Sequence, residues 1–260
     1  MRDILTVKNL NLSFGGLKAV DNLEFSIKEG QIYGIIGPNG AGKTTVFNCL
    51  SSFYKPDSGE LFFDGHNLRK TAVHDMVRIG IVRTFQNVEL FKYMTVLDNL
   101  MVGQHSQVKY NLLSAALRLP SVGREEQALK ARAVEVMEFL GLGGIENLMA
   151  GAQPYGIQKL IELGRALVAQ PKLLILDEPA AGMNSSETAA LAVLIRRIRK
   201  ELGITILMVE HDMSLVMEVC EQICVLNFGK KIAEGSPAEV QLDPVVQEAY
   251  LGKEDTDVST

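Results

Sequence analysis

The chain has 260 residues, of which 47% are hydrophobic and 22% are charged, and its formal net charge is −5 at pH 7. A chain of this length and composition can bury a full hydrophobic core, so disordered and fibrous classes are excluded. The acidic balance argues against a general nucleic-acid scaffold, which is usually basic. Cys49, Cys220 and Cys224 lie in apolar surroundings, and we expect them to be reduced core residues.

No segment has the run of about 18 apolar residues needed to span a bilayer, and the N-terminal residues lack the features of a signal peptide. We therefore expect a soluble, cytoplasmic protein that reaches a membrane only through a partner. Residues 253–260 are predicted to form a polar tail.

The first half of the chain predicts strands and one helix around a glycine-rich segment. Alternating apolar residues predict strands over Ile4–Phe14 and Leu23–Ile27, which we interpret as antiparallel edge elements. The continuous apolar run Ile32–Ile36 predicts a strand that is covered on both faces. A helix is predicted over Thr44–Leu50, and a strand over Glu60–Asp64 leads into an Asp-Gly turn.

From Asn87 to Gly164 the strand pattern disappears and helical periodicity dominates, as over Gln127–Leu140. We interpret this segment as an inserted helical subdomain, because strand patterns resume after it. The later predicted elements are strands over Leu173–Leu176, Ile204–Val209 and Ile223–Leu226, a helix from a capping box at Asn184–Glu187 to Gly203, and a final helix capped at Ser236–Glu239. Strands that alternate with helices predict an α/β fold with a mostly parallel sheet.

The segment from Gly37 to Thr44 matches the pattern G-x4-G-K-[ST], and it lies between a buried strand and a helix, as a phosphate-binding loop requires. Its glycines allow backbone N–H groups to point at an anion, and the helix N-terminus adds positive potential. Lys43 can contact the β- and γ-phosphates, and the Thr44 hydroxyl can ligate Mg²⁺. No Asn in the chain is followed by Lys, so the guanine-selecting motif is absent and ATP is favoured over GTP.

Two acidic residues follow the apolar strand Leu173–Leu176. Asp177 can hold the Mg²⁺ shell, while Glu178 is left to polarise a water molecule for attack on the γ-phosphate. An acidic pair at a strand end could also be a helix cap, but the phosphate-binding loop earlier in the chain favours the catalytic interpretation.

With these motifs the chain resembles the ATP-binding subunits of ABC transporters over about Ile4–Gly252. The resemblance implies a P-loop NTPase fold of the ABC ATPase type: one domain over residues 1–252, with a nucleotide-binding core at 1–86 and 165–252 and a helical subdomain at 87–164. It also implies ATP and Mg²⁺ as cofactors. The catalytic set is Glu178, His211 and Gln86, and the metal set is Thr44, Gln86 and Asp177. The nucleotide-binding set is Phe14, Gly37, Pro38, Asn39, Gly40, Ala41, Gly42, Lys43, Thr44, Thr45, Tyr155 and Gly156.

Several segments are similar to the larger-type ATPases of branched-chain amino acid importers. They are Val82–Phe91, Met94–Leu100, Glu178–Asn184, Val209–Met213 and Glu248–Gly252. Members of this group also serve importers of amides, urea or aromatic acids. The resemblance implies two transmembrane permease subunits, a second ABC ATPase or a second copy of this chain, and an indirect partnership with an extracellular or periplasmic solute-binding protein. It places the chain on the inner face of the cell membrane, with no nucleic-acid partner.

The family signature Leu-Ser-Gly-Gly-Gln is replaced here by Gln153–Ile157, so Pro154 removes a serine hydroxyl and a backbone donor. The family's aspartate in the D-loop is replaced by Asn184. The helix after the signature keeps one apolar face, made of Ile157, Leu160, Ile161, Gly164, Leu167 and Val168, opposite the polar residues Gln158, Lys159, Glu162 and Arg165.

Two other functions are considered. A soluble ABC-type regulatory or DNA-repair ATPase would usually carry two fused nucleotide domains or long heptad repeats, and neither is seen. A nucleotide-binding scaffold that does not hydrolyse ATP would not need Glu178. The apolar segment Tyr110–Leu119 is interpreted as helical-subdomain core, with a docking surface for a transmembrane subunit as the alternative.

Overall fold

The computed structural model describes residues 2–84, 88–108 and 120–251, and it divides into two compact units. The first unit contains the chain up to Ile81 and from Lys172 onward, and the second contains Val82–Pro171. The strands are β1 (Asp3–Phe14), β2 (Leu17–Lys28), β3 (Ile32–Ile36), β4 (Ser58–Phe63), β5 (His66–Asn67), β6 (Ile81–Arg83), β7 (Leu173–Asp177), β8 (Thr205–Val209), β9 (Gln222–Asn227) and β10 (Lys230–Gly235).

The α-helices of the first unit are α1 (Lys43–Leu50), α2 (Met76–Ile79), α7 (Ser185–Leu202), α8 (Met213–Val219), α9 (Pro237–Leu242) and α10 (Pro244–Leu251). Those of the second unit are α3 (Val96–Val102), α5 (Pro120–Phe139) and α6 (Tyr155–Leu167). Short 3₁₀ helices cover Leu68–Lys70, Val73–Asp75, His105–Gln107 and Ala150–Ala152. None of the helices in the described ranges combines the length and apolarity needed to cross a membrane.

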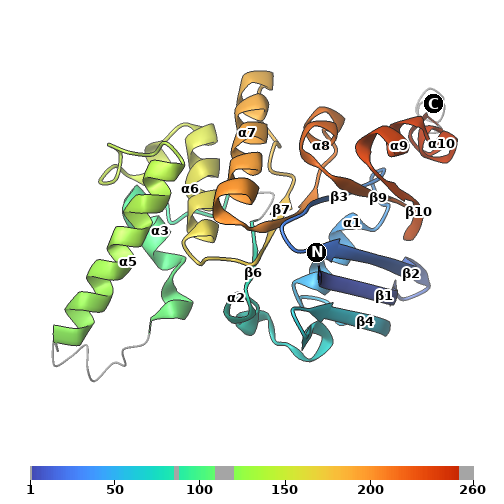
Figure 1. The fold of residues 1–260 in the computed structure, drawn as a ribbon, viewed down its shortest axis with the longest axis horizontal. Coiled ribbons are helices and arrows are strands. Elements are labelled where there is room, and N and C mark those ends of the chain that lie inside the picture. The colour runs from blue at the N-terminus through green and yellow to red at the C-terminus, as the bar shows by residue number, and fades with distance from the viewer. Residues whose placement is uncertain (1, 85–87, 109–119, 252–260) are drawn as a thin grey trace. The chain divides into compact units, whose positions relative to one another are not determined.

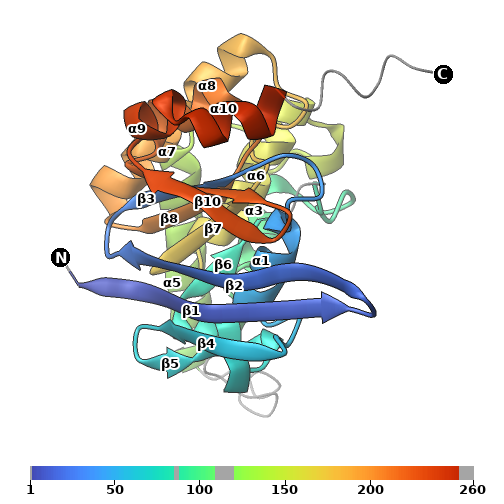
Figure 2. The same cartoon turned by 90° about the vertical axis from the view of Figure 1, so that its right-hand side faces the viewer.

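Four strands of the first unit form an antiparallel sheet in the order β2-β1-β4-β5 (Figure 2). β1 is hydrogen-bonded to β2 along one side and to β4 along the other, so the prediction that it is an edge element is wrong. β4 lies far from β1 in the sequence, so the alternation within β1 does not reveal that the two strands pair. The predicted Asp-Gly turn joins β4 to β5, with φ of 45° at Asp64 and 82° at Gly65, as a two-residue hairpin requires.

The second sheet has the order β10-β9-β3-β8-β7-β6. β3 pairs in parallel with β8 and β9, and β7 pairs in parallel with β8, which confirms the predicted α/β fold with a mostly parallel core. Every residue of β3, β7 and β8 is buried, as their continuous apolar runs predict. The last strand, β10, runs antiparallel to β9 and was not predicted, because its segment Lys230–Gly235 is mostly polar.

Alternate residues of β3 face opposite sides of the sheet. Tyr33 and Ile35 of β3 belong to one core cluster with α1 and the antiparallel sheet. Gly34 points the other way, because a Cβ there would lie 2.9 Å from Cys220 Sγ. Figures 1 and 2 show α7 to α10 on the face of the sheet opposite to α1 and the antiparallel sheet. All three cysteines are buried and free, as predicted.

The two predicted capping boxes are present, and one helix more than predicted follows them. Asn184 and Glu187 form a capping box at the start of α7, and Gly203 ends the helix with φ of 68°. Ser236 caps α9 in the same way. This helix is not the final one as predicted, because Asp243 accepts a hydrogen bond from the Val245 N–H at 2.8 Å and starts α10.

In the second unit α3 packs against α5 and α6 (Figure 1). The predicted helix over Gln127–Leu140 lies within the longer α5, apart from Leu140, which follows its end. Lys159 and Glu162 of α6 are both buried, so the prediction of one apolar face opposite a polar one is incomplete. Glu162 lies three residues from both Lys159 and Arg165, a spacing that places opposite charges together on a helix. The segment Tyr110–Leu119 lies outside the described residues.

Candidate functional site

The loop between β3 and α1 adopts a backbone that only glycine can supply at two positions. At Gly37 φ is 151°, and a Cβ would lie 2.1 Å from the Leu226 carbonyl oxygen. At Gly42 φ is 99°, and a Cβ would lie 2.5 Å from the Ala19 carbonyl oxygen. Within the described residues no side chain caps the N-terminus of α1. Its first N–H groups can therefore serve an anion bound in the loop.

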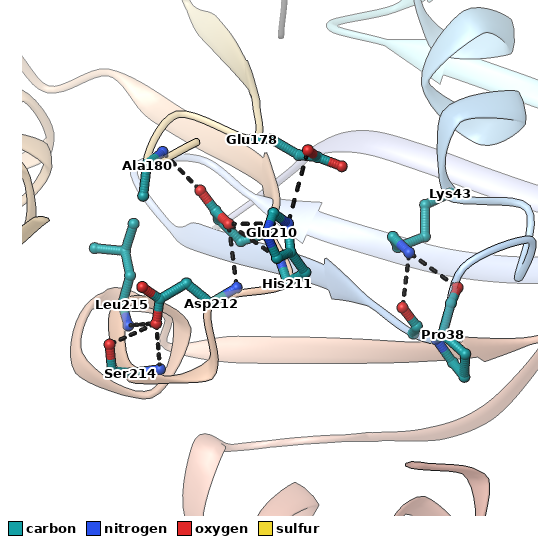
Figure 3. Close-up of polar contacts among 10 residues, drawn as sticks. Pro38, Lys43, Glu178, Ala180, Glu210, His211, Asp212, Ser214 and Leu215 are labelled. Carbon is teal, nitrogen blue, oxygen red and sulfur yellow. Dashed lines mark hydrogen bonds and ion pairs between the residues drawn. The ribbon is translucent and has the colours of Figure 1, made fainter. Parts of the chain in front are cut away.

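Lys43 is the first residue of α1, and its side chain turns back into this loop (Figure 3). Its Nζ donates hydrogen bonds to the carbonyl oxygens of Gly37 at 2.7 Å and of Pro38 at 3.0 Å. Lys43 is only 8% exposed. The ammonium is thus held at the loop by contacts that a phosphate oxygen could replace.

A cavity of about 360 Å³ opens beside the loop. Its lining residues are Phe14, Leu17, Lys18, Ala19, Asn39, Gly40, Ala41, Gly42, Lys43, Thr44, Thr45, Glu178, Phe228 and Gly229. The lining combines three large apolar side chains, from Phe14, Leu17 and Phe228, with the polar loop and the Glu178 carboxylate. Such a cavity can hold a molecule that has a flat ring at one end and anionic groups at the other.

Three contacts fix the walls of the cavity. The Phe14 ring meets the Tyr54 ring edge to face, with centroids 5.3 Å apart. The turn between β9 and β10 is joined to the loop, because the Gly229 N–H donates to the Ala41 carbonyl at 2.9 Å. The Asp21 N–H donates to the Gly229 carbonyl at 2.8 Å, which connects the same turn to β2.

The acidic pair lies where β7 ends. Asp177 is the last residue of β7 and is 8% exposed. Glu178 follows with φ of 46°, a conformation that L residues other than Asn and Asp rarely adopt. Its N–H donates to the Val209 carbonyl at 2.9 Å, so the end of β7 remains joined to the end of β8.

His211 lies beside Glu178 (Figure 3). Its Nδ1 is 3.7 Å from Glu178 Oε2 and 3.8 Å from Glu210 Oε2. The side chain of His211 is 61% exposed, while that of Glu210 is completely buried. His211 does not belong to the cavity lining, but it lies next to Glu178, which does.

Residues 20–181 match the protein family described as "ABC transporter". The chain belongs to the ABC transporter ATP-binding family. A second family, described as "Branched-chain amino acid ATP-binding cassette transporter", matches residues 230–256. The ABC ATPase identity read from the sequence motifs is confirmed.

Two curated relatives align along nearly the whole ABC ATPase chain. The high-affinity branched-chain amino acid transport ATP-binding protein BraF of Pseudomonas aeruginosa is 43% identical and covers 97% of this chain and 99% of its own length. The corresponding protein LivG of Escherichia coli K12 is 44% identical and covers 96% and 98%. These relatives are transport proteins, and they give no support to the regulatory or DNA-repair alternative.

Among solved structures, the ADP conformation of MJ1267, an ATP-binding cassette of an ABC transporter, superposes with a TM-score of 0.84. It is 33% identical, and the alignment covers 97% of this ABC ATPase and all of that chain. A nucleotide-free ATP-binding cassette from an ABC transporter superposes with a TM-score of 0.80 at 32% identity, covering 96% and 99% of the two chains.

The structure brings together most of the predicted site residues of this ABC ATPase in its first unit. Phe14, Glu178 and residues 39–45 line the cavity, and Gly37 and Pro38 contact Lys43. Tyr155 and Gly156 begin α6 in the second unit and do not belong to this lining. Pro154 is the N-cap of α6 and accepts a hydrogen bond from the Gln158 N–H at 3.0 Å. Gln86 lies outside the described residues.

Several cavity residues were not predicted. Leu17, Lys18, Ala19, Phe228 and Gly229 come from strand ends and a turn, where no motif points to a ligand. Tyr250 of α10, which lies near the Gly37 backbone, is another residue that no sequence motif indicates. Burial raises the pKa of Tyr250 to about 12, so its phenol stays neutral at physiological pH.

Proposed function

We propose that this ABC ATPase is the ATP-hydrolysing subunit of a branched-chain amino acid importer. The observation that carries the mechanism is the single cavity that joins the glycine loop, an apolar wall and Glu178. The solute class is supported by the printed names of the relatives and by the second matched family at residues 230–256.

Phe14 stacks on the adenine ring at the apolar end of the cavity, and the backbone of residues 37–45 surrounds the phosphates. This assignment agrees with the exposure of Phe14, which is 47% and leaves a ring face available. Lys43 exchanges the Gly37 and Pro38 carbonyls for the β- and γ-phosphates. Tyr155 and Gly156 act on the nucleotide of an opposite subunit, as the family resemblance implies.

Thr44 and Asp177 would hold Mg²⁺, with Gln86 as a further ligand. A hydroxyl and a carboxylate are hard oxygen donors of the kind this ion prefers, so the residues fit the ion. In the described residues no group of three His, Cys, Asp or Glu side chains could hold a metal. The hydroxyl of Thr44 and the carboxylate of Asp177 instead suit an ion that completes its shell with phosphate oxygens and water. When bound, the ion neutralises charge on the phosphates.

Glu178 orients a water molecule and accepts its proton as the water oxygen bonds to the γ-phosphorus and the bond to the leaving ADP breaks. His211, at 3.7 Å from Glu178, contacts the γ-phosphate. Residues 87–164 act as the helical subdomain that passes closure of the site to the membrane subunits.

The assembly that we propose contains two transmembrane permease subunits and a second ATPase, either another protein or a copy of this chain. A solute-binding protein outside the membrane delivers the solute, and this chain lies on the inner membrane face without a nucleic-acid partner. Two chains are needed because, as the family resemblance implies, Tyr155 and Gly156 of each chain act on the nucleotide bound by the other.

The central test is Glu178→Gln, which keeps the size of the side chain and removes its charge. ATP binding is expected to persist while hydrolysis falls by about 10²–10⁴-fold. Turnover within a few-fold of wild type would remove Glu178 from this role. Uptake of labelled leucine by the complete transporter tests the solute, with amides, urea and aromatic acids as competitors. A transporter that accumulates one of these instead of leucine would overturn the proposed solute class.

A further inference from the structure

The carboxylate of Glu210 occupies an unusual position, completely buried at the end of β8 and directly before His211. It does not line the nucleotide cavity. A buried carboxylate is costly unless hydrogen-bond donors surround it. Three backbone N–H groups do so here, and they come from two different turns (Figure 3).

Each oxygen of Glu210 serves one of these turns. Oε1 accepts a hydrogen bond from the Ala180 N–H at 2.7 Å, across the gap between the strand ends. Oε2 accepts from the N–H groups of His211 at 3.0 Å and Asp212 at 3.2 Å, within its own turn. One side chain therefore connects the turn that carries Glu178 to the turn that carries His211.

The turn that carries Glu178 is closed by the Ala181 N–H, which donates to the Glu178 carbonyl at 3.1 Å, and it is joined to the end of β8 on both sides of Glu178. Pro179 has no N–H, so Ala180 supplies the first donor after Glu178. Glu178 itself has a positive φ, which surrounding contacts must maintain. Its own N–H bonds to Val209, the residue before Glu210. The backbone on both sides of Glu178 is thus fixed to two consecutive residues of the neighbouring strand end.

We propose that Glu210 is a positioning residue for ATP hydrolysis, which holds Glu178 and His211 in the mutual geometry that the reaction needs. This inference rests on the proposed role of Glu178. Because Glu210 is buried, it acts without touching the nucleotide. A displacement of about 1 Å at a reacting group can lower a rate by about 10²-fold, so loss of this link reduces turnover while the phosphate-binding loop remains intact.

Glu210→Gln tests the inference with little change in volume. The amide group replaces one acceptor oxygen by NH₂, which then faces a backbone N–H instead of accepting from it. In the full chain, assembled with its co-purified transporter subunits, kcat is expected to fall by about 10- to 100-fold. The Kd for ATP is expected to stay within about twofold of wild type.

Glu210→Asp separates the two sets of bonds and covers the case in which Glu210→Gln fails to fold. The shorter side chain keeps the charge and can still serve its own turn, but it cannot also reach Ala180. We expect a fall in kcat of about 5- to 20-fold, between wild type and Glu210→Gln, with unchanged ATP affinity. A folded Glu210→Asp variant with full kcat overturns the inference.

Two comparisons separate positioning from general destabilisation. Ser236→Ala removes the cap of α9, so it is expected to lower Tm without changing kcat. In the Glu178→Gln background, adding Glu210→Gln is expected to change the residual rate by less than twofold, because Glu210 acts through Glu178.

If the two losses multiply, the role is structural. If Glu178→Gln abolishes hydrolysis but Glu210→Gln does not slow it, the positioning role fails while the proposed function stands. If Glu178→Gln hydrolyses normally, both fail.

Discussion

Lys43→Ala is expected to weaken ATP binding by about 10- to 150-fold. The ammonium is held by the Gly37 and Pro38 carbonyls at 2.7 and 3.0 Å, so it already lies at the loop that receives the phosphates. A hydrogen bond to a charged group contributes about 1.5–3 kcal/mol. Since about 1.4 kcal/mol corresponds to a tenfold change in affinity, the loss of one such phosphate contact gives the stated range.

The assay is titration of the purified chain with a fluorescent ATP analogue, followed by competition with ATP and AMP. Because AMP lacks the β- and γ-phosphates, its affinity is expected to change by less than threefold, and the ratio of ATP to AMP affinity should fall. Lys230→Ala is the control, since this lysine pairs with Asp21 at 3.3 Å and lies outside the cavity lining. Unchanged ATP affinity in Lys43→Ala refutes the reasoning.

Two further predictions concern the altered signature and acid stability. Pro154→Ser restores a hydroxyl and a backbone donor at the start of α6, so ATPase activity of the isolated chain is expected to rise about tenfold or more; equal, robust rates in both proteins would contradict this. The Lys172 ammonium holds the pKa of Asp64 below its usual value of 3.8, and Ser214 does the same for Asp212. The stability these ionised carboxylates provide is present above about pH 4 and is lost as the pH falls through their lowered pKa values. Urea midpoints measured from pH 7 to pH 3 should show this loss, and Asp64→Asn should reduce it.

Apolar patterns were sufficient to predict the central strands, because β3, β7 and β8 are buried on both faces and bounded by turns. The same reasoning could not find β10, whose lysines and glutamate are compatible with a strand only because β9 supplies its partner. It also could not place β1 in the interior of its sheet, since pairing with β4 is a long-range contact. Local patterns predict which segments form strands better than they predict which strands pair with each other.

The candidate site also contains residues that local patterns predict and residues that only long-range contacts bring together. The loop from Gly37 to Thr44 and the Asp177–Glu178 pair have fixed sequence spacing, so they could be predicted with their elements. Ala19 and Gly229 enter the cavity only because hydrogen bonds connect β2, the loop and the β9–β10 turn. Glu210 was inconspicuous as one acid in a polar segment, and only its burial and its three donors distinguish it.

The backbone of Glu178 implies a conflict between durability and turnover. With φ of 46°, this residue occupies a conformation that costs an ordinary L residue about 1–2 kcal/mol and costs glycine almost nothing. Selection of variants for heat resistance alone would therefore favour glycine or asparagine at position 178. Such variants would survive heating better and would lack the carboxylate at the cavity. At position 178 the residue that favours ATP hydrolysis therefore differs from the residue that favours thermal stability.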